Sequence, residues 1–245
     1  MQKQQLAKSF ESIGEEYDRY RPGFPAAAAA EIIPELVDSV LDLGAGTGKF
    51  TELLIERADR VVAVEPSAAM LDVLRAKLPN VEAIVGGAES IALPDATLDA
   101  VTVAQAFHWF DRDPACAEMA RVLVPGGTLG LLWNHSDPTC TWDRACHRVA
   151  HPAVAEEDAT TESAAEELPG FAFDHHAEIA WSENIARSAY IARWLTVSSF
   201  LVADEETRAQ MVAELEAILD ADPQTAGQSQ FELPMLTDVF VYTAS

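Results

Sequence analysis

Short apolar runs and amphipathic stretches alternate along the middle of this chain. Apolar runs bounded by polar or glycine positions predict buried strands, and apolar residues that return every three or four positions predict helices. The expected strands here are Val40–Leu43, Arg60–Val64, Val81–Val85, Leu98–Val103 and Thr128–Trp133, and the expected helices are Thr51–Arg57, Ser67–Leu78 and Pro114–Leu123. This alternation is typical of crossover units, which build a parallel sheet covered by helices on both faces.

The residues before this region have a helical pattern that is broken once. Apolar side chains recur at helical spacing up to Tyr17, and the prolines and glycine of the segment RPGFP (21–25) end that helix. A second helix is expected from Pro25 to about Val37, with Pro34 disturbing its end.

The alternation changes after Trp133. An acidic, alanine-rich run follows, and we interpret it as a solvated helix face. Beyond it the sequence predicts a strand at Phe171–Trp181, helices at Ala186–Phe200 and Glu205–Leu219, and a last strand at Phe231–Tyr242.

The composition indicates a soluble globular protein. Of the 245 residues, 49% are hydrophobic, and the formal net charge is -24. So acidic a surface repels phosphate backbones and anionic lipid heads, so we expect neither a nucleic acid nor a membrane as partner. No apolar stretch reaches membrane-spanning length, and no basic segment followed by an apolar run opens the chain. Three cysteines without a CxxC pair favour a reducing compartment, and we expect a cytoplasmic protein.

The segment VLDLGAGTGKF (40–50) contains the first candidate site. Gly44, Gly46 and Gly48 follow the first expected strand, at the sheet edge where open parallel sheets bind ligands. A dinucleotide site would have its third glycine one residue later, and the carboxylate of Asp42 would repel a pyrophosphate. The same carboxylate suits a ligand with an ammonium group. The loop therefore favours a nucleoside joined to a positively charged amino acid, as in S-adenosylmethionine.

Several segments then resemble class I S-adenosylmethionine-dependent methyltransferases of type 11, in the order that this family has them. VLDLGAGTGKFT is similar to the family's first motif, and VVAVEPSAAML is similar to the second. GGAESIALPDATLDAVTVAQAFHWF and RVLVPGGTLGLLWN are similar to the stretches around the fourth and fifth strands.

The resemblance implies an α/β fold with a Rossmann-like, doubly wound, seven-stranded sheet that is mostly parallel and has one antiparallel C-terminal strand. It also implies a single domain over residues 1–245. Within it we expect an N-terminal helical lid at 1–38, a cofactor-binding core at 39–134, acceptor-side helices and a strand at 135–230, and the last strand at 231–245.

Cofactor contacts follow from the same resemblance. Glu65 takes the place of the acid that binds both ribose hydroxyls, for which a carboxylate is a suitable acceptor. The family often has an aspartate for the adenine amino group where this sequence has Gly86-Gly87. We therefore expect the Ala88 amide to contact the adenine, and either Glu89 or a main-chain carbonyl to bind its amino group. The expected cofactor-binding residues are Arg21, Asp42, Gly44, Ala45, Gly46, Thr47, Gly48, Glu65, Pro66, Met70, Gly87, Ala88, Glu89, Gln105 and Ala106.

The segment QAFHWF (105–110) is similar to a His-Trp variant found in small-molecule members such as trans-aconitate-type methyltransferases. His108 is the candidate catalytic residue, as a general base or as a hydrogen-bond donor to the acceptor. Alternatively, His108 only forms a wall of the cofactor pocket. The candidate acceptor-site residues are Tyr17, Tyr20, Trp109, Trp133, Asn134, Trp142, Arg193, Trp194 and Ser198.

The predicted function is methyl transfer from S-adenosylmethionine to a small organic acceptor on oxygen, carboxylate or hydroxyl, with S-adenosylhomocysteine as product. A non-catalytic S-adenosylmethionine-binding module and a nicotinamide-dependent reductase are the alternatives. His147 and His151 have a spacing that can hold a metal on a helix, but no clear third ligand accompanies them, and we expect no metal site. The sequence leaves the oligomeric state and the identity of the acceptor open.

Overall fold

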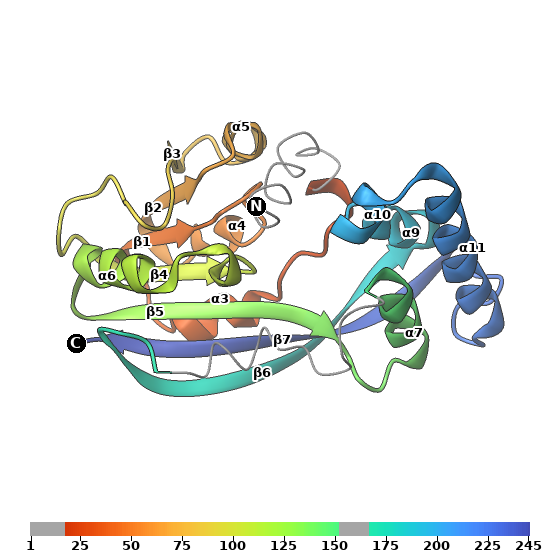
Figure 1. Cartoon of the computed structure of the whole chain (residues 1–245). Helices are drawn as coiled ribbons and strands as arrows, with labels where there is room; N and C mark the ends of the chain where they lie inside the picture. The colour runs from red at the N-terminus through yellow and green to blue at the C-terminus, as the bar shows by residue number, and fades with distance from the viewer. Residues whose placement is uncertain (1–17, 152–166) are drawn as a thin grey trace. The chain divides into compact units, whose positions relative to one another are not determined.

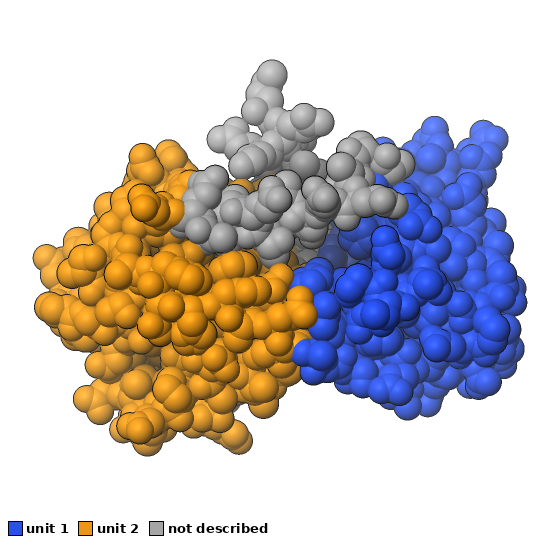
Figure 2. Space-filling view, turned by 90° about the horizontal axis from the view of Figure 1, so that it is seen from below, with its two compact units in different colours: residues 1–22, 135–158, 180–236 blue, residues 23–134, 159–179, 237–245 orange. Residues whose placement is uncertain are grey.

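The computed structural model describes residues 18–151 and 167–245 (Figure 1). The expected helix that ends at Tyr17 and nearly all of the acidic run lie outside these residues. The described chain gathers into two compact units (Figure 2). Unit 1 contains residues 18–22, 135–151 and 180–236, and unit 2 contains residues 23–134, 167–179 and 237–245. The predicted division into a lid, a core and an acceptor side stays a prediction.

Seven strands of the described chain form one sheet in the order β3-β2-β1-β4-β5-β7-β6. Strands β1 to β5 pair in parallel, and Figure 1 shows β7 running in the opposite direction to β5. This sheet confirms the predicted fold class. The strands are β1 (Val37–Leu43), β2 (Ala58–Glu65), β3 (Glu82–Val85), β4 (Leu98–Ala104), β5 (Leu123–Ser136), β6 (Phe171–Ala186) and β7 (Gln230–Ala244).

Unit 2 has a hydrophobic core on each face of its part of the sheet. Successive side chains of a strand point to opposite faces, so Val40 joins one core and Leu41 joins the other. Three helices contribute to the core around Val40: α3 (Ala26–Ile32), α4 (Thr51–Leu54) and α5 (Ala68–Lys77). Helix α6 (Arg112–Val122) contributes to the core around Leu41. The strands are thus covered on both faces, as the apolar runs predicted.

The predicted helix from Pro25 to Val37 was too long. The helix α3 ends at Ile32, and Val37 is already the first residue of β1. Pro34 lacks a backbone N–H and disfavours a helical conformation at Ile33, so the helix cannot continue through this pair.

Within the described residues, unit 1 combines four complete helices with the ends of long strands. These helices are α7 (Thr141–Ala150), α9 (Arg187–Leu195), α10 (Ser198–Val202) and α11 (Glu205–Ala221). Buried side chains from all four pack with residues of β7 such as Phe231 and Leu233. The sequence did not predict α7, and the predicted helix Ala186–Phe200 is divided into α9 and α10 at Thr196–Val197. Among the described residues, no helix has the length and apolar character needed to cross a membrane.

Candidate active site

The glycine loop lies at the carboxyl end of β1. Gly44, Gly46 and Gly48 have φ angles of 74°, 56° and 84°, a region that side-chain-bearing residues rarely adopt. A Cβ atom on Gly44 would lie 2.6 Å from the Cβ of Ala106, so only glycine fits there. This contact brings the loop directly against the segment that follows β4.

Glu65 at the end of β2 holds the glycine loop in place. Its Oε2 accepts a hydrogen bond from the Gly46 N–H at 3.0 Å, and its Oε1 accepts one from the Ser67 N–H at 2.9 Å. Burial raises the pKa of this carboxyl group, while the two N–H donors act in the opposite direction. Each oxygen has a second acceptor site, because a carboxylate offers about four in total. Glu65 can therefore accept two neighbouring hydroxyl groups, as predicted for a ribose.

Asp42 lies deeper than the loop. In the parallel register it pairs with Ala63, two residues before Glu65, and its side chain is only 1% exposed. The Thr51 hydroxyl donates to Oδ2 at 2.6 Å and the Thr102 hydroxyl to Oδ1 at 3.1 Å. Burial raises the pKa of Asp42 to about 6, although both hydroxyl donors lower it. The carboxylate thus carries negative charge beneath the loop at neutral pH, and its effect on the cofactor stays a prediction.

Two observations test whether these residues fit S-adenosylmethionine. The Thr47 hydroxyl is buried in the loop and has no hydrogen-bond partner within residues 18–151 and 167–245. The Glu65 carboxylate has free acceptor sites at the same loop, as described above. A buried polar atom without a partner is rare in folded proteins, and a polar ligand would satisfy it. The loop therefore fits a polar cofactor with neighbouring hydroxyl groups, such as the two of a ribose.

Further predicted cofactor-binding residues lie in the segments that follow β2 and β3. Pro66 precedes Ser67, whose hydroxyl caps α5 by accepting from the N–H of Met70 at 3.3 Å. Ala88 is buried, whereas Glu89 is exposed and its Oε1 accepts from the Asp111 N–H at 2.9 Å. One Glu89 oxygen is therefore already engaged, and Glu89 as the partner of the adenine amino group stays a prediction.

The segment after β4 has a strained start. Gln105 has a φ of 57°, which is uncommon for a residue other than glycine. Its N–H donates to the Leu132 carbonyl at 2.9 Å and its side-chain amide to the Asn134 carbonyl at 3.0 Å. These bonds to β5 hold a conformation that would otherwise be unfavourable, and such strain is typical of functional sites.

The short 3-10 helix η1 (Phe107–Trp109) carries the candidate catalytic histidine. His108 is half-buried, and its ring lies 4.9 Å from the ring of Trp109 at an angle of 45°. Trp109 is 40% exposed. Since Ala106 contacts Gly44, η1 starts at the glycine loop and places His108 within the same unit as the cofactor motif.

Two predicted acceptor-site residues at the end of β5 differ in their bonding. Asn134 donates through Nδ2 to the Gly23 carbonyl at 2.8 Å, and its Oδ1 accepts from the Thr237 hydroxyl at 2.6 Å. Its side chain therefore joins β5 to β7 and to the segment before α3. Trp133 is buried against Phe240, and its indole N–H has no partner in the described chain.

The other predicted site residues belong to unit 1, apart from Tyr17, which lies outside the described residues. Arg21 donates to the Thr196 hydroxyl at 3.0 Å and to the Thr196 carbonyl at 3.1 Å. The Arg19 guanidinium lies 5.3 Å from the centre of the Tyr20 ring. Trp142 Nε1 donates to the Gln224 side chain at 3.1 Å, and Ser198 starts α10. A direct role of Arg21 at the cofactor stays a prediction.

His147 and His151 lie at the end of α7, where the second of them is the C-cap. Their rings stack with centroids 4.3 Å apart, and both also lie against the ring of Trp194. The helical spacing noted in the sequence thus produces an aromatic stack.

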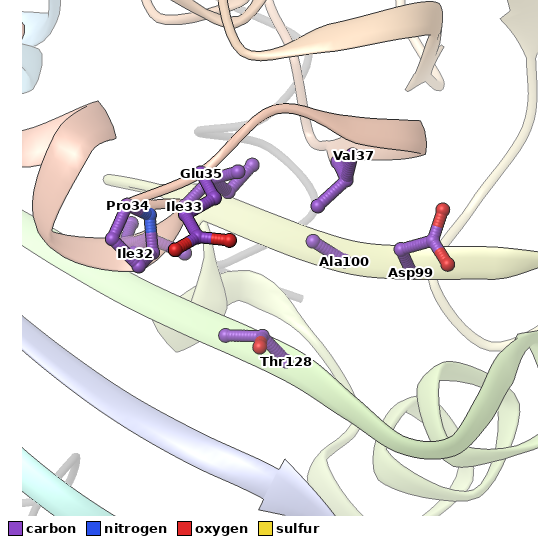
Figure 3. Close-up of a pocket in the computed structure, with 8 residues that line it drawn as sticks. All are labelled: Ile32, Ile33, Pro34, Glu35, Val37, Asp99, Ala100 and Thr128. Carbon is purple, nitrogen blue, oxygen red and sulfur yellow. The ribbon is translucent and has the colours of Figure 1, made fainter.

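A pocket of about 190 Å³ lies elsewhere in unit 2 (Figure 3). Figure 3 shows side chains from the end of α3, the start of β1, the start of β4, and β5 around it. These are the amino ends of the parallel strands, opposite to the glycine loop, so this pocket is separate from the candidate site.

Sequence reasoning missed several polar residues. Thr51 and Thr102, the partners of Asp42, were expected only as helix and strand positions. Thr51 could have been found, because it opens the helix that follows the glycine loop. Thr102 and the buried pair Asp143–Tyr190 give no local signal, since each meets its partner across about 50 residues or more.

Comparisons with known proteins agree with this geometry. Residues 41–131 match the family described as "Methyltransferase domain". An uncharacterized methyltransferase of Mycobacterium tuberculosis (strain ATCC 25618 / H37Rv) is 37% identical over 232 residues, which cover 95% of this chain and 94% of the relative. An uncharacterized methyltransferase of Schizosaccharomyces pombe (strain 972 / ATCC 24843) is 31% identical over 242 residues, covering 95% of each chain.

A solved structure has the same fold over most of its length. It is named "Putative Type II Methyltransferase" from Anaeromyxobacter dehalogenans, with a TM-score of 0.72 and 28% identity over 92% of this chain and 97% of that chain. Together with the glycine loop and Glu65, these relatives favour the methyltransferase prediction over the nicotinamide-dependent reductase. The chain belongs to the class I S-adenosylmethionine-dependent methyltransferases and carries a type 11 methyltransferase domain.

Proposed function

We propose that this methyltransferase methylates a small organic acceptor on oxygen, at a carboxylate or a hydroxyl group. The observation that carries the proposal is the contact between Gly44 and Ala106, because it sets the segment bearing His108 against the cofactor loop. The likeness of QAFHWF to trans-aconitate-type methyltransferases also supports an oxygen acceptor. The net charge of -24 supports a small acceptor, because such a surface repels anionic macromolecules.

The cofactor supplies a methyl group on a sulfonium centre that is already activated for displacement. The protein then has to bind the two reactants, align them and exclude water. Glu65 and Thr47 would hold the nucleoside part through its hydroxyl groups. The buried Asp42 carboxylate would favour the cationic part through its charge, which acts over a short distance in a poorly hydrated interior.

His108 would act on the acceptor in one of two ways. A hydroxyl acceptor has to lose its proton, which the imidazole can accept as a general base. A carboxylate acceptor is already deprotonated at neutral pH, so His108 would only donate a hydrogen bond that orients it. We propose the orienting role, because alignment alone can supply much of the rate of a methyl transfer.

The test compares His108→Ala with His108→Gln in a turnover assay that measures S-adenosylhomocysteine over a panel of hydroxyl and carboxylate acceptors. For an orienting residue, His108→Gln should keep much of the rate, because its amide can still donate, and His108→Ala should lose most of it. For a general base, both variants should lose about 100-fold or more.

Binding of S-adenosylmethionine to both variants serves as the control. An affinity near wild type is expected in either role, whereas weaker binding in both variants would show that His108 is part of the cofactor pocket wall. No product with any oxygen acceptor would contradict the proposal, and binding without turnover would favour a non-catalytic module.

A further inference from the structure

Unit 1 contains buried polar atoms that its own residues leave unsatisfied. Asp143 is fully buried in α7, and its Oδ2 has no hydrogen-bond partner within the described chain. The same holds, among the described residues, for Nη1 of Arg193 and for the indole Nε1 of Trp194, which is 3% exposed. Burying such atoms without a partner destabilises the fold, so each of them needs an explanation.

These atoms belong to one cluster of side chains. The Tyr190 hydroxyl donates to the other Asp143 oxygen, Oδ1, at 2.6 Å. Tyr190, Arg193 and Trp194 share one face of α9, because residues three and four positions apart are neighbours on a helix. The Arg193 guanidinium lies 5.3 Å from the centre of the Tyr190 ring and 5.0 Å from that of Trp194. Asp143 and Arg193 thus both lie against Tyr190.

The cluster contains one acidic and one basic side chain that do not contact each other as an ion pair. In the described part of the chain, Asp143 and Arg193 form no ion pair with each other, although both act electrostatically on Tyr190 and Cys146. Arg193 Nη1 and Trp194 Nε1 are hydrogen-bond donors and need an acceptor. Asp143 Oδ2 is an acceptor and needs a donor. A single ligand would satisfy all three atoms if it carried an anionic group and a hydrogen-bond donor.

We propose that the cluster of Asp143, Tyr190, Arg193 and Trp194 binds a small organic acid that also carries a hydroxyl or an ammonium group. Arg193 and Trp194 bind the acid group, as a guanidinium fork and an indole N–H suit its oxygens. Asp143 binds the hydroxyl or ammonium group, and Tyr190 positions Asp143. Arg193 and Trp194 are also candidate acceptor-site residues, so the proposal rests on the proposed function where it names a ligand class for them. The site lies wholly in unit 1, and binding there needs no methyl donor.

The test uses acids that differ in one group, without S-adenosylmethionine. Propionate, lactate and alanine share a three-carbon chain and carry a hydrogen, a hydroxyl or an ammonium at the second carbon. Succinate, malate and aspartate repeat the set on a four-carbon chain. Ligand-observed saturation-transfer NMR should show that a member with a donor binds about tenfold more tightly than the matched acid without one.

Three variants locate the binding site. Trp194→Phe keeps a ring in the stack but removes the N–H, and should weaken binding of the best ligand about tenfold. Asp143→Asn keeps the shape and still accepts from Tyr190, but should abolish the preference for the ligand with the donor. Trp181→Phe is the control, because Trp181 packs on the same hydrophobic core of unit 1 but belongs neither to the cluster nor to the candidate acceptor-site residues. It should leave binding unchanged.

Several outcomes would overturn this site. One is equal binding of all three acids in each set. Another is an affinity that Asp143→Asn and Trp194→Phe leave unchanged. A third is a loss of affinity with Trp181→Phe as large as that with Trp194→Phe. If none of the acids binds at about ten millimolar, the unsatisfied atoms only contact buried water and the proposal is wrong. The proposed methyl transfer is tested by separate measurements at the cofactor loop, so the two can fail independently.

Discussion

The buried acids of the two units are satisfied to different degrees. In unit 2, Asp42 accepts from two threonine hydroxyls and Glu65 from two backbone N–H groups. In unit 1, Asp143 has one donor, Tyr190, and its second oxygen has none among the described residues. The two acids at the cofactor loop are therefore held by the protein's own residues, and the Thr47 hydroxyl is left for a ligand, whereas in unit 1 the buried acid itself is only partly satisfied.

This difference suits two kinds of binding, that of a cofactor in unit 2 and that of one particular ligand in unit 1. A loop that always binds the same cofactor can be held by its own residues, so that binding requires little reorganisation. A cluster that recognises one particular ligand leaves hydrogen-bonding atoms for it, and those atoms then reject a molecule that cannot pair with them. The following predictions test this distinction, from the largest expected effect to the smallest.

Asp42 should limit the stability of unit 2. Burial raises its pKa from 3.8 to about 6, so the folded state holds more protons than the unfolded state between these values. Stability therefore falls as the pH rises through this window and stays lower above it. At 1.36 kcal/mol per pH unit, Asp42→Asn should raise the free energy of unfolding by about 3 kcal/mol at pH 7.5 and by almost nothing at pH 4.

Urea unfolding at the two pH values measures the change in stability, and calorimetry measures the affinity of the variant for S-adenosylmethionine. The variant should bind the cofactor more weakly, because it lacks the buried negative charge. A variant that is no more stable at pH 7.5 than the wild type would show that the two threonines fully compensate for the burial.

Glu65 should matter for binding more than for folding. Glu65→Ala removes the acceptor for the Gly46 and Ser67 N–H groups and for the cofactor hydroxyls, and should weaken S-adenosylmethionine binding by about 2 kcal/mol. Glu65→Gln is the matched control, since it keeps the length of the side chain but has only one acceptor oxygen. Its affinity for S-adenosylmethionine should lie between those of the wild type and Glu65→Ala. Unchanged affinity of Glu65→Ala in calorimetry would mean that the loop holds its shape and its ligand without this side chain.

Tyr190 tests the unit 1 side of the comparison. Tyr190→Phe removes the only donor that the described residues give Asp143, and should lower the free energy of unfolding by about 1 kcal/mol. Thr51→Val removes one donor from Asp42 and is the corresponding change in unit 2. If the unit 1 cluster is open to ligand or water, Tyr190→Phe should be the milder of the two in thermal unfolding. A larger loss for Tyr190→Phe would show that unit 1 is the more rigid region.

The sequence predicted the parallel strands of unit 2 for a physical reason. The loop, Glu65 and the strands before them lie close together along the chain, so apolar runs and glycines mark them locally. Helix α7 was missed although apolar residues recur at helical spacing from Trp142 to Ala150, because the prolines and the acidic run around it suggested irregular structure. The Asp143–Tyr190 hydrogen bond joins α7 to α9, and no local sequence pattern predicts a contact between residues 47 positions apart.

The position of β7 has a consequence for how the protein is made. In the order β5-β7-β6, the one described strand that pairs with β6 is β7, which follows it by more than 40 residues along the chain. During synthesis β6 thus emerges from the ribosome with its backbone hydrogen-bonding groups unpaired, until the last strand inserts between it and β5. An unpaired strand of this length can join another chain and aggregate. The acidic side chains along β6, such as Asp174 and Glu178, would repel a second nascent copy during that interval.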